Sequence, residues 1–552
     1  MVTDVDTKMS LCEQLLLAVY IISKIIPSSV VGEISACKNE TFVAGVNRGI
    51  LSGFIHVGGG GGTKAAAHGR GAAPAGFEDP VPAEGWTGVR DGSAVTPKCP
   101  QLSISTYISG DRIVVEGQED CLYLSVYTPQ PHPSDLPVMV WIHGGAFTLG
   151  CTEEYSPLPL LTRDIVLVSI QYRLATLGFL STEDEELPGN LGLKDQTLAL
   201  RWVQDNIRKF GGDPEKVTIF GESAGGASEI IDCLSRLDLF KRAIMQSGTT
   251  LCPWALREDH REALGKLVHL LNCSGFDQTS RSLDSKAAVA CLKKVPADKL
   301  TSVQLAFNIW NGNPTVMLPR VDGEFLPDHP AVLLREGKYN KVDLISGITK
   351  HEGEIATLMT IGNKEATTSL MENFSQYGPA ALYIDDWDDD PEYLARRAFH
   401  HYLGPMEITM EKPMLICSSW VTSCLRHVLW TLLKSIQRTE HLAIAFTRTS
   451  SSLSGHTKCL SFSSDRRLIL QKTGLVTATT FCTFSLRWNP TPDLSLGFKW
   501  TPMSHARDTH LAINLTPFMK EFSYHQVYDF WRNMPTKKNK LLHPKRFSRC
   551  HS

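Results

Sequence analysis

A series of continuous apolar, β-branched runs, separated by helix-like segments, most constrains the fold of this chain. "LKDQTLALRWVQDNIRKFG" is one such segment, with apolar residues at helical spacing and a glycine at its end. Runs without polar alternation suit strands that are buried on both faces of a parallel sheet. The pattern predicts an α/β fold with a central, mostly parallel sheet flanked by helices. The runs lie at 136–145, 165–174, 216–223, 240–248 and 342–353.

The composition excludes some classes of partner. The chain has 552 residues, 42% hydrophobic and 20% charged, and its formal net charge is -3. This balance is that of a globular protein, and it predicts no nucleic-acid partner. After the N-terminal region no stretch is apolar enough to span a bilayer, so no membrane span is predicted. The glycine run from Gly58 lacks the phosphate-loop pattern, because Lys64 follows Thr63 instead of a glycine. We expect no cofactor and no metal.

Several features predict a secreted protein. Within residues 1–36 a lysine precedes an apolar run and small residues follow, as in a secretory signal. Fourteen cysteines suit a disulfide-permissive compartment, and small disulfide-closed loops are expected at Cys99/Cys121 and Cys273/Cys291. Glycosylation is expected at the sequons of Asn39, Asn272 and Asn373. Residues 42–56 alternate apolar and small residues around glycines, which predicts a short antiparallel hairpin.

The turn "GESAGG" carries the chemistry. It places Ser223 at G-x-S-x-G spacing between a buried run and a helix-like segment, where small neighbours permit a strained backbone. The amide of Ala224 can stabilise an oxyanion there, helped by the helix N-terminus. Gly144 and Gly145 in "WIHGGAF" supply further N–H donors from an earlier strand end. Ser223 is therefore predicted to be a nucleophile, which needs a base because its hydroxyl is weakly acidic.

An acid and then a histidine should follow the serine along the chain. "ISGITKHEGEIA" places Glu352 at the end of an apolar run, and Glu354 is a rival later in the same turn. The alternative for either residue is a solvated loop carboxylate.

The chain closely resembles the type-B carboxylesterase and cholinesterase family of α/β-hydrolases, of the invertebrate-carboxylesterase type. The resemblance covers most of 85–360 and parts of the C-terminal third. It rests on "EDCLYLSVYTP", "VMVWIHGGAFTLG", "YRLATLGFLS", "GNLGLKDQTLALRWVQDNIRKFGGDPEKVTIFGESAGGAS", "FKRAIMQSG", "GITKHEGE", "WNPTP" and the helix-like "HQVYDFWRNM".

The resemblance implies the α/β-hydrolase fold in one large domain, residues 37–535. The basic residues at 536–552 predict a solvated tail, with a heparin-binding patch as the alternative. It also implies acyl transfer to Ser223, with Glu352 as the acid that orients the base. By resemblance Gly144, Gly145 and Ala224 form the oxyanion hole, Cys99 pairs with Cys121, and Cys273 pairs with Cys291. Arg173 and Asp195 occupy the positions of a structural ion pair.

The chain departs from the family pattern at 58–75 and at about 413–487. The family histidine lies in a Gly-x-x-His-acidic segment, and the nearest match is His456 in "LSGHTKCL", where Thr457 and Lys458 replace acidic residues. His427 and His441 are the alternatives. One hypothesis is that misjoined exons or frame slips produced both atypical segments. The other is a divergent protein with a broken triad.

The resemblance predicts a serine esterase for apolar carboxylic esters, with a small-molecule substrate and an oligomeric state that the sequence leaves open. Cholinesterases place a tryptophan in the first disulfide loop to hold a cation, and residues 99–121 contain none. Acetylcholine is therefore disfavoured. A second hypothesis is a catalytically inactive, cholinesterase-like binding or adhesion protein.

Overall fold

The computed structural model describes the chain in segments. These are residues 49–56, 76–82, 96–109, 112–130, 134–155, 157, 159–234, 238–273, 276–277, 282–309, 315–349, 352, 368–370, 372–384, 388–404, 427–434, 443–448, 480–485, 490–491, 498–503, 508–513, 517–523 and 525–548.

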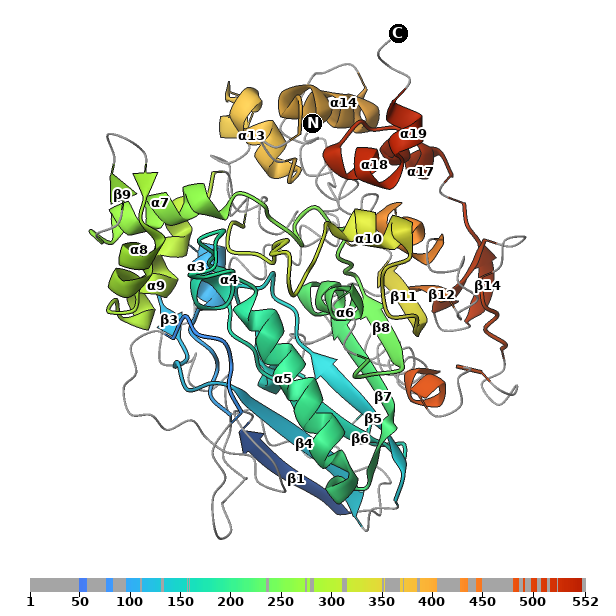
Figure 1. Ribbon diagram of the computed structural model, residues 1–552. Coiled ribbons are helices and arrows are strands. Elements are labelled where there is room, and N and C mark those ends of the chain that lie inside the picture. Colours follow the sequence, from blue (N-terminus) through green and yellow to red (C-terminus); the bar gives the residue numbers. More distant parts are fainter. Residues whose placement is uncertain are drawn as a thin grey trace, which may run out of the picture.

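The described residues form a ten-stranded sheet, in the order β1-β4-β6-β5-β7-β8-β11-β12-β13-β14 (Figure 1). The pairs from β6 through β13 are parallel, whereas β1/β4, β4/β6 and β13/β14 are antiparallel. The predicted mostly parallel sheet is confirmed. The strands are β1 Gly49–His56, β4 Tyr123–Gln130, β5 Leu136–Ile142, β6 Val166–Ile170, β7 Gly212–Glu222, β8 Arg242–Gln246, β11 Asp343–Thr349, β12 Ala443–Arg448, β13 Thr509–Ile513 and β14 Phe518–Glu521.

Helices flank this sheet. In Figure 1, α5 and α6 lie over one of its faces, and α13, α14 and α17 to α19 gather at one end of the molecule. The helices are α3 Ile104–Ser109, α4 Ala175–Phe179, α5 Leu191–Asn206, α6 Ala224–Leu234, α7 His260–Leu270, α8 Ser285–Leu292, α9 Ala297–Ser302, α10 Pro330–Glu336, α13 Phe374–Ala381, α14 Pro391–Leu403, α17 His525–Arg532, α18 Lys537–Leu542 and α19 Pro544–Phe547. The helix-like segment at 193–211 becomes α5, whose continuation ends at Gly211 in a left-handed conformation.

Burial on both faces explains why the central strands lack polar alternation. Successive residues of a strand point to opposite faces. In β5, Val140 and Ile142 enter one hydrophobic cluster, whereas Met139 and Trp141 enter a second cluster on the opposite face. All seven residues of β5 are buried.

The hairpin predicted at 42–56 is wrong for the part that the structure describes. Residues 49–56 form the single strand β1, which pairs in antiparallel register with β4, from Gly49 opposite Gln130 to His56 opposite Tyr123. The alternation of apolar and small residues correctly indicated a strand. Its partner, β4, lies more than sixty residues away in sequence.

The covalent and ionic links implied by the resemblance are present. Disulfides join Cys99 to Cys121 and Cys273 to Cys291. The side chain of Arg173 donates to both carboxylate oxygens of Asp195, at 2.8 and 2.7 Å. Such a bidentate geometry fixes the relative orientation of the loop after β6 and helix α5.

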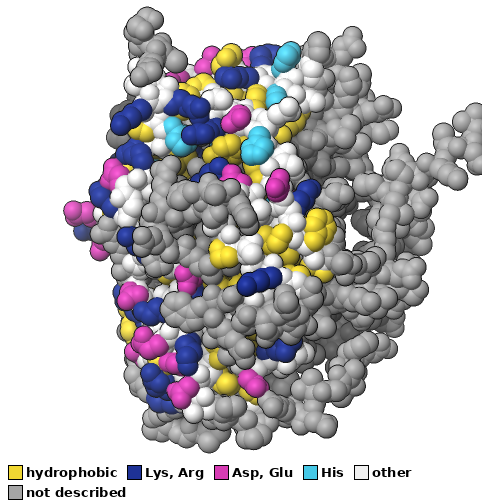
Figure 2. Space-filling view, turned by 90° about the vertical axis from the view of Figure 1, so that its right-hand side faces the viewer, with side chains coloured by type: hydrophobic (Ala, Val, Ile, Leu, Met, Phe, Trp, Pro, Cys, Tyr) yellow, Lys and Arg dark blue, Asp and Glu magenta, His cyan; other side chains and the backbone are white. Residues whose placement is uncertain are grey.

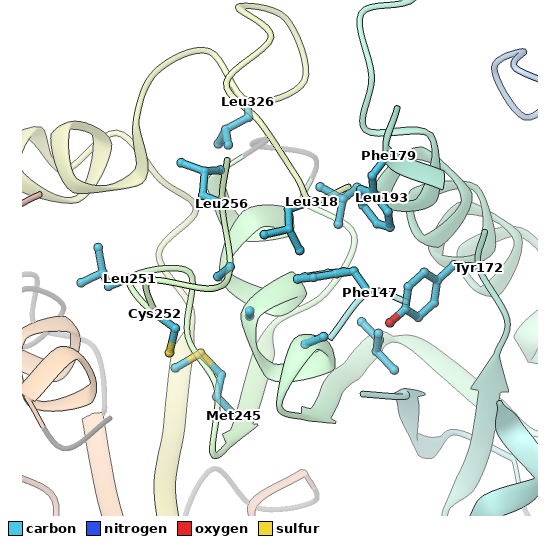
Figure 3. Packing of buried hydrophobic residues seen from close by; sticks show 14 of the residues in the cluster. Phe147, Tyr172, Phe179, Leu193, Met245, Leu251, Cys252, Leu256, Leu318 and Leu326 are labelled. Carbon is cyan, nitrogen blue, oxygen red and sulfur yellow. The ribbon is translucent and has the colours of Figure 1, made fainter. Parts of the chain in front are cut away.

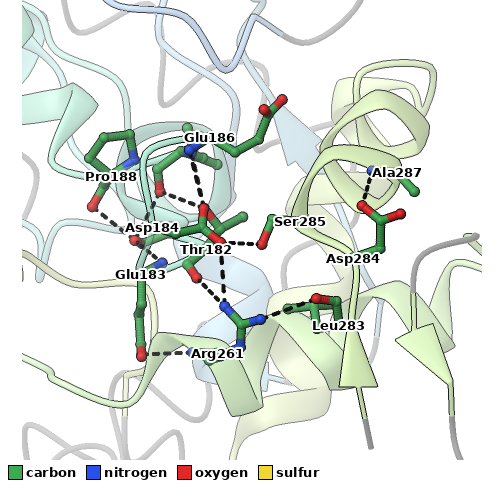
Figure 4. A network of polar contacts seen from close by, with 12 residues as sticks. Thr182, Glu183, Asp184, Glu186, Pro188, Arg261, Leu283, Asp284, Ser285 and Ala287 are labelled. Atoms are coloured by element: carbon green, nitrogen blue, oxygen red, sulfur yellow. Dashed lines mark hydrogen bonds and ion pairs between the residues drawn. The ribbon is translucent and has the colours of Figure 1, made fainter.

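A polar network attaches the loop 181–188 to α7 and α8 (Figure 4). The guanidinium of Arg261 donates to the carbonyl of Thr182 at 2.9 Å and to the carboxylate of Asp184 at 3.4 Å. Ser285, at the start of α8, donates to the same Asp184 carboxylate. Three segments that are far apart in sequence are thereby held together at the surface.

The basic tail predicted from residue 536 is not a solvated tail over 536–548. Residues 537–542 form α18, in which Asn539 and Leu542 are buried. The ammonium group of Lys537 lies 2.5 Å from a carboxylate oxygen of Glu258, and Lys540 pairs with Asp389. The segment is basic, as predicted. Its lysines form ion pairs with acidic side chains of other segments instead of extending into solvent. On the face shown in Figure 2, basic and acidic side chains are interspersed.

Among the described residues, no helix combines the length and the apolar character needed to cross a membrane.

Candidate active site

Ser223 lies at the junction of β7 and α6, in a left-handed backbone conformation with φ of 55°. This conformation is costly for a residue that carries a Cβ atom, typically by about 1–3 kcal/mol, and persists only where neighbours enforce it. Two hydrogen bonds enforce it here. The amide of Ser223 donates to the carbonyl of Gln246 at 2.8 Å, and the amide of Ala227 donates to the carbonyl of Ser223 at 3.0 Å.

Close backbone approaches explain two of the glycines around this turn. A Cβ built on Gly225 would lie 2.1 Å from the carbonyl oxygen of Ile142, and one on Gly248 would lie 1.9 Å from that of Ser223. Neither position can accept a side chain without displacing backbone. The strand-to-helix turn therefore packs directly against the end of β5 and the segment after β8.

Residues 143–150, here called the glycine loop, follow β5 and border the turn. A Cβ built on Gly144 would lie 3.2 Å from the Cβ of Ser223. Three successive residues of the loop have positive φ, namely Gly145 at 108°, Ala146 at 54° and Phe147 at 60°. Amides further along, at Thr148 and Leu149, donate back to the carbonyl of Gly145 at 2.9 and 3.0 Å.

These conformations leave hydrogen-bond donors unused beside Ser223. The N–H groups of Gly144, Gly145 and Ala146 donate to no acceptor among the described residues. The amide of Ala224 opens α6, and an amide in the first turn of a helix has no acceptor within its own helix. No sequence pattern indicated that the amide of Ala146 is a further donor. This amide is available because Ala146 itself has a positive φ, which is uncommon for a residue other than glycine.

Glu352 is buried, with 5% of its surface exposed. Its Oε1 accepts from the hydroxyl of Ser247 at 2.6 Å and from the amide of Thr349 at 2.5 Å. Ser247 precedes Gly248, whose Cα packs against Ser223, so Ser247 connects the acid to the serine turn. Sequence reasoning assigned no role to Ser247, although it lies near the end of the predicted strand at 240–248 and directly follows β8. Glu354 lies outside the described residues.

A second carboxyl group, that of Glu222, lies next to Ser223. Burial, together with the nearby charge of Glu352, raises the pKa of Glu222 to about 8. A Cβ built on Gly144 would lie 2.8 Å from its Oε2. At neutral pH, Glu222 therefore retains its proton more readily than an ordinary glutamate does.

The predicted base is not among the residues that can be placed. His456 and the alternative His441 lie outside the described residues. The other alternative, His427, is buried, and its ring lies 5.1 Å from that of Tyr528 in α17. Burial and the neighbouring His543 lower the pKa of His427 to about 3. The contacts of His427 thus belong to the packing of the C-terminal helices, not to Ser223 or Glu352.

Apolar side chains surround the serine turn. Phe147 is fully buried and packs edge-on against Phe179, with ring centroids 5.1 Å apart. Figure 3 shows Phe147, Leu256 and Leu318 lying around the first turns of α6. The polar donors of the glycine loop are therefore set in an apolar surrounding, where electrostatic interactions are stronger than in water.

The remaining predicted sites lie away from this turn. Asn272 and Asn373 are exposed, whereas Asn39 lies outside the described residues. Among the described residues, no group of three or more His, Cys, Asp or Glu side chains is arranged to hold a metal ion.

Comparison with known proteins identifies relatives of this chain. A family model of the carboxylesterase family matches residues 71–418. The chain is 35% identical to venom carboxylesterase-6 of Apis mellifera, over 61% of this chain and 61% of the relative. It is 41% identical to carboxylesterase 1E of Mus musculus, over 50% and 51% of the two chains. It is also 37% identical to the bile salt-activated lipase of Bos taurus, over 54% and 51%.

The aligned regions thus span between half and about three fifths of these curated relatives. The family match includes the glycine loop, the serine turn and Glu352, and it ends at residue 418, close to the start of the atypical segment at 413–487. A match over more than half of the chain, together with the mostly parallel sheet, shows that this chain belongs to the carboxylesterase family and has its α/β-hydrolase fold.

Proposed function

We propose that this protein is a serine esterase that hydrolyses carboxylic esters through an acyl-enzyme intermediate. One observation supports the proposal above all others. Ser223 occupies a strained turn beside a group of unused backbone N–H donors, and a buried carboxylate, Glu352, is connected to the same turn through Ser247. Such an arrangement suits a nucleophile, an oxyanion site and an orienting acid.

In the proposed reaction, the base removes the proton of the Ser223 hydroxyl as its oxygen attacks the ester carbonyl carbon. The carbonyl oxygen becomes an anion, which accepts hydrogen bonds from the amides of Gly144, Gly145 and Ala224, and from that of Ala146. The C–O bond to the alcohol then breaks, and the base returns the proton to the departing alcohol. Water, deprotonated by the base, attacks the acyl-enzyme and releases the acid and Ser223.

We assign the base to His456, with Glu352 accepting a hydrogen bond from the imidazole and stabilising its charged form. The hydrogen bonds that Glu352 accepts from Ser247 and Thr349 favour the ionised carboxylate. His427 is less suited, because its ring packs against Tyr528 and its low pKa makes it a weak base.

The substrates we propose are small esters with apolar groups. The apolar side chains around the glycine loop, Phe147 and Leu318 among them, support this choice. Relatives described as carboxylesterases, and one described as a lipase, point to the same class of bond.

Secretion and N-glycosylation are part of the proposal. Two disulfides, the exposed sequon residues Asn272 and Asn373, and a relative described as a venom carboxylesterase support it.

Labelling with a fluorophosphonate probe tests the nucleophile. We expect covalent labelling of the full chain, loss of labelling in Ser223→Ala, and unchanged labelling in Ser285→Ala, a partly exposed serine at the start of α8. In parallel, His456→Ala should abolish ester hydrolysis, whereas His427→Ala should retain it in the folded fraction. A folded wild-type chain without Ser223-dependent labelling would instead support the inactive binding protein.

A further inference from the structure

Gln101 makes an unusual set of hydrogen bonds with the glycine loop. Its Nε2 donates to the carbonyl of Gly150 at 3.0 Å, and its Oε1 accepts from the amide of the same residue at 2.8 Å. Nε2 also donates to the carbonyl of Cys99 at 3.0 Å. The side chain is buried, with 4% of its surface exposed. One carboxamide thus satisfies both backbone groups of Gly150.

Gly150 connects this contact to the serine. It has φ of 118°, and a Cβ built on it would lie 2.4 Å from the carbonyl oxygen of Gly144 and 2.5 Å from Nδ1 of His143. The end of the glycine loop therefore packs against its beginning. Since Gly144 in turn borders Ser223, the position of Gly150 constrains the donors that face the serine.

Gln101 itself is held rigidly by the first disulfide loop. It lies two residues after Cys99, which is bonded to Cys121, and pairs with Glu116 in a short antiparallel ladder. A second buried contact, at 3.1 Å, links the hydroxyl of Thr96, which precedes Cys99, to the hydroxyl of Thr152, which follows the glycine loop. Gln101 therefore joins the disulfide loop to the glycine loop, and the Thr96–Thr152 contact joins the residues directly beside these two loops.

We propose that Gln101 is a positioning residue for the esterase reaction: it fixes Gly150 and thereby aligns the N–H donors of the glycine loop with the developing oxyanion. This inference rests on the proposed esterase function. Donors that act on the transition state contribute to kcat more than to substrate binding, so a misaligned loop lowers kcat with little change in KM.

A pair of substitutions separates positioning from folding. In Gln101→Glu, an ionised carboxylate would face the carbonyl oxygens of Gly150 and Cys99, whereas a protonated one would reproduce the carboxamide's donor and acceptor. We expect kcat per titrated active site to fall about tenfold or more near neutral pH. The ratio of variant to wild-type kcat should then recover as pH falls from about 8 towards about 5, because the carboxyl group becomes protonated. Gln118→Glu, an exposed glutamine in the same disulfide loop, is the matched control and should show a constant ratio.

The groups around Gln101 and Gly150 either keep one protonation state in this range or are shared by the wild type and the control variant. His143, packed behind Gly150, has a pKa lowered by burial to about 4 and stays neutral. Burial also raises the pKa of the Cys151 thiol to about 11. Lys98 and Glu116, from the disulfide loop, are paired at 2.8 Å, and the control variant reports any change that they contribute. The carboxyl group of Glu222, which lies close to Gly144, has a pKa of about 8 and begins to titrate at the upper end of this range, but it is common to wild type, variant and control.

Hydrogen–deuterium exchange gives a readout that does not depend on activity. In Gln101→Ala the amides of residues 144–150 should exchange faster than in wild type, while those of Gln118→Ala should not. Unchanged exchange, or kcat within about twofold of wild type in both Gln101 variants, would overturn the inference. If the wild-type chain hydrolyses no ester, the proposed function fails, and the exchange rates alone decide whether Gln101 holds the loop.

Discussion

At the residue scale, two carboxyl groups share the environment of Ser223. Glu352 accepts hydrogen bonds that favour its ionised form, whereas Glu222 receives none from the described residues that would do so. Burial and the charge of Glu352 together raise the pKa of Glu222 to about 8. When two carboxyl groups lie near each other, one proton is commonly retained between them. The site thus combines a carboxyl group that accepts two hydrogen bonds, that of Glu352, with a second one, that of Glu222, which retains its proton to a higher pH than an ordinary glutamate does.

Replacing Glu222 by glutamine should change the pH dependence of stability. In the unfolded chain a glutamate titrates near pH 4.3, about four units below Glu222 in the folded protein. Between these values the native state binds the extra proton, so the contribution of Glu222 to stability is lost as pH rises to about 8. Glutamine does not titrate. The free energy of unfolding of Glu222→Gln, minus that of wild type, should therefore increase with pH over this range and then level off.

Urea unfolding at several pH values measures this difference, and each unit of pKa shift corresponds to about 1.4 kcal/mol. Glu185→Gln, at an exposed loop position, should give a difference that hardly varies with pH. A difference that decreased with pH for Glu222→Gln would contradict the assigned protonation state.

At the element scale, the glycine loop depends on a segment outside the central sheet. Its own hydrogen bonds, from Thr148 and Leu149 to Gly145, close a turn but leave Gly150 unsatisfied. Gln101 from the first disulfide loop provides the missing partners. The second disulfide, Cys273–Cys291, joins the end of α7 to α8, and within the described part of the chain neither of its cysteines bonds to the glycine loop.

Removing each disulfide should therefore have different effects on activity. The two bridges enclose loops with sequence separations of 22 and 18, so their entropic contributions to stability are similar, about 3 kcal/mol each. We expect both double serine variants to unfold at lower urea concentrations. The folded fraction of Cys99→Ser/Cys121→Ser should also lose most of its kcat, whereas Cys273→Ser/Cys291→Ser should keep it. Equal kcat values in the two variants would show that the first bridge does not support the site.

At the scale of the whole molecule, the C-terminal helices fasten segments from the middle of the chain. The ammonium group of Lys538 donates to the carbonyl of Leu251 at 2.6 Å, and the amide of Lys537 donates to Asp388 at 2.6 Å. Arg335 of α10 donates to the carbonyl of Leu541. The segment after β8, which follows Gly248 and the serine turn, is therefore held in part by residues close to the C-terminal end of the described chain.

Truncating the buried side chain of α18 should destabilise the whole protein. Leu542 is buried in the main hydrophobic cluster, and Leu542→Ala should lower the free energy of unfolding by about 2–3 kcal/mol. Lys545→Ala, at an exposed position of α19, should change it by less than about 0.5 kcal/mol. Chemical denaturation compares the two variants, and similar small changes in both would mean that α18 is only loosely attached.

The sequence predicted those features that depend on local pattern. Continuous apolar runs indicated the central strands, and the G-x-S-x-G turn located Ser223. Features that depend on contacts between distant segments were missed, because no local pattern records them. The partner of β1, the hydrogen bond from Ser247 to Glu352 and the contact of Gln101 with Gly150 are of this kind. The lysines of α18 were expected to be solvated because their acidic partners, Glu258 and Asp389, lie far away in sequence.

Loss of strand β12 would expose the strands on both sides of it. It lies inside the segment that departs from the family pattern, and it pairs in parallel with β11 on one side and β13 on the other. A transcript that skipped codons 443–448 would remove β12 and leave β11 and β13 each without a hydrogen-bonded neighbour on one side. The edge of β11, whose seven residues are all buried, would then present unpaired backbone groups on an apolar strand. Such edges promote intermolecular strand pairing, so a chain shortened in this way should form aggregates instead of a smaller folded protein.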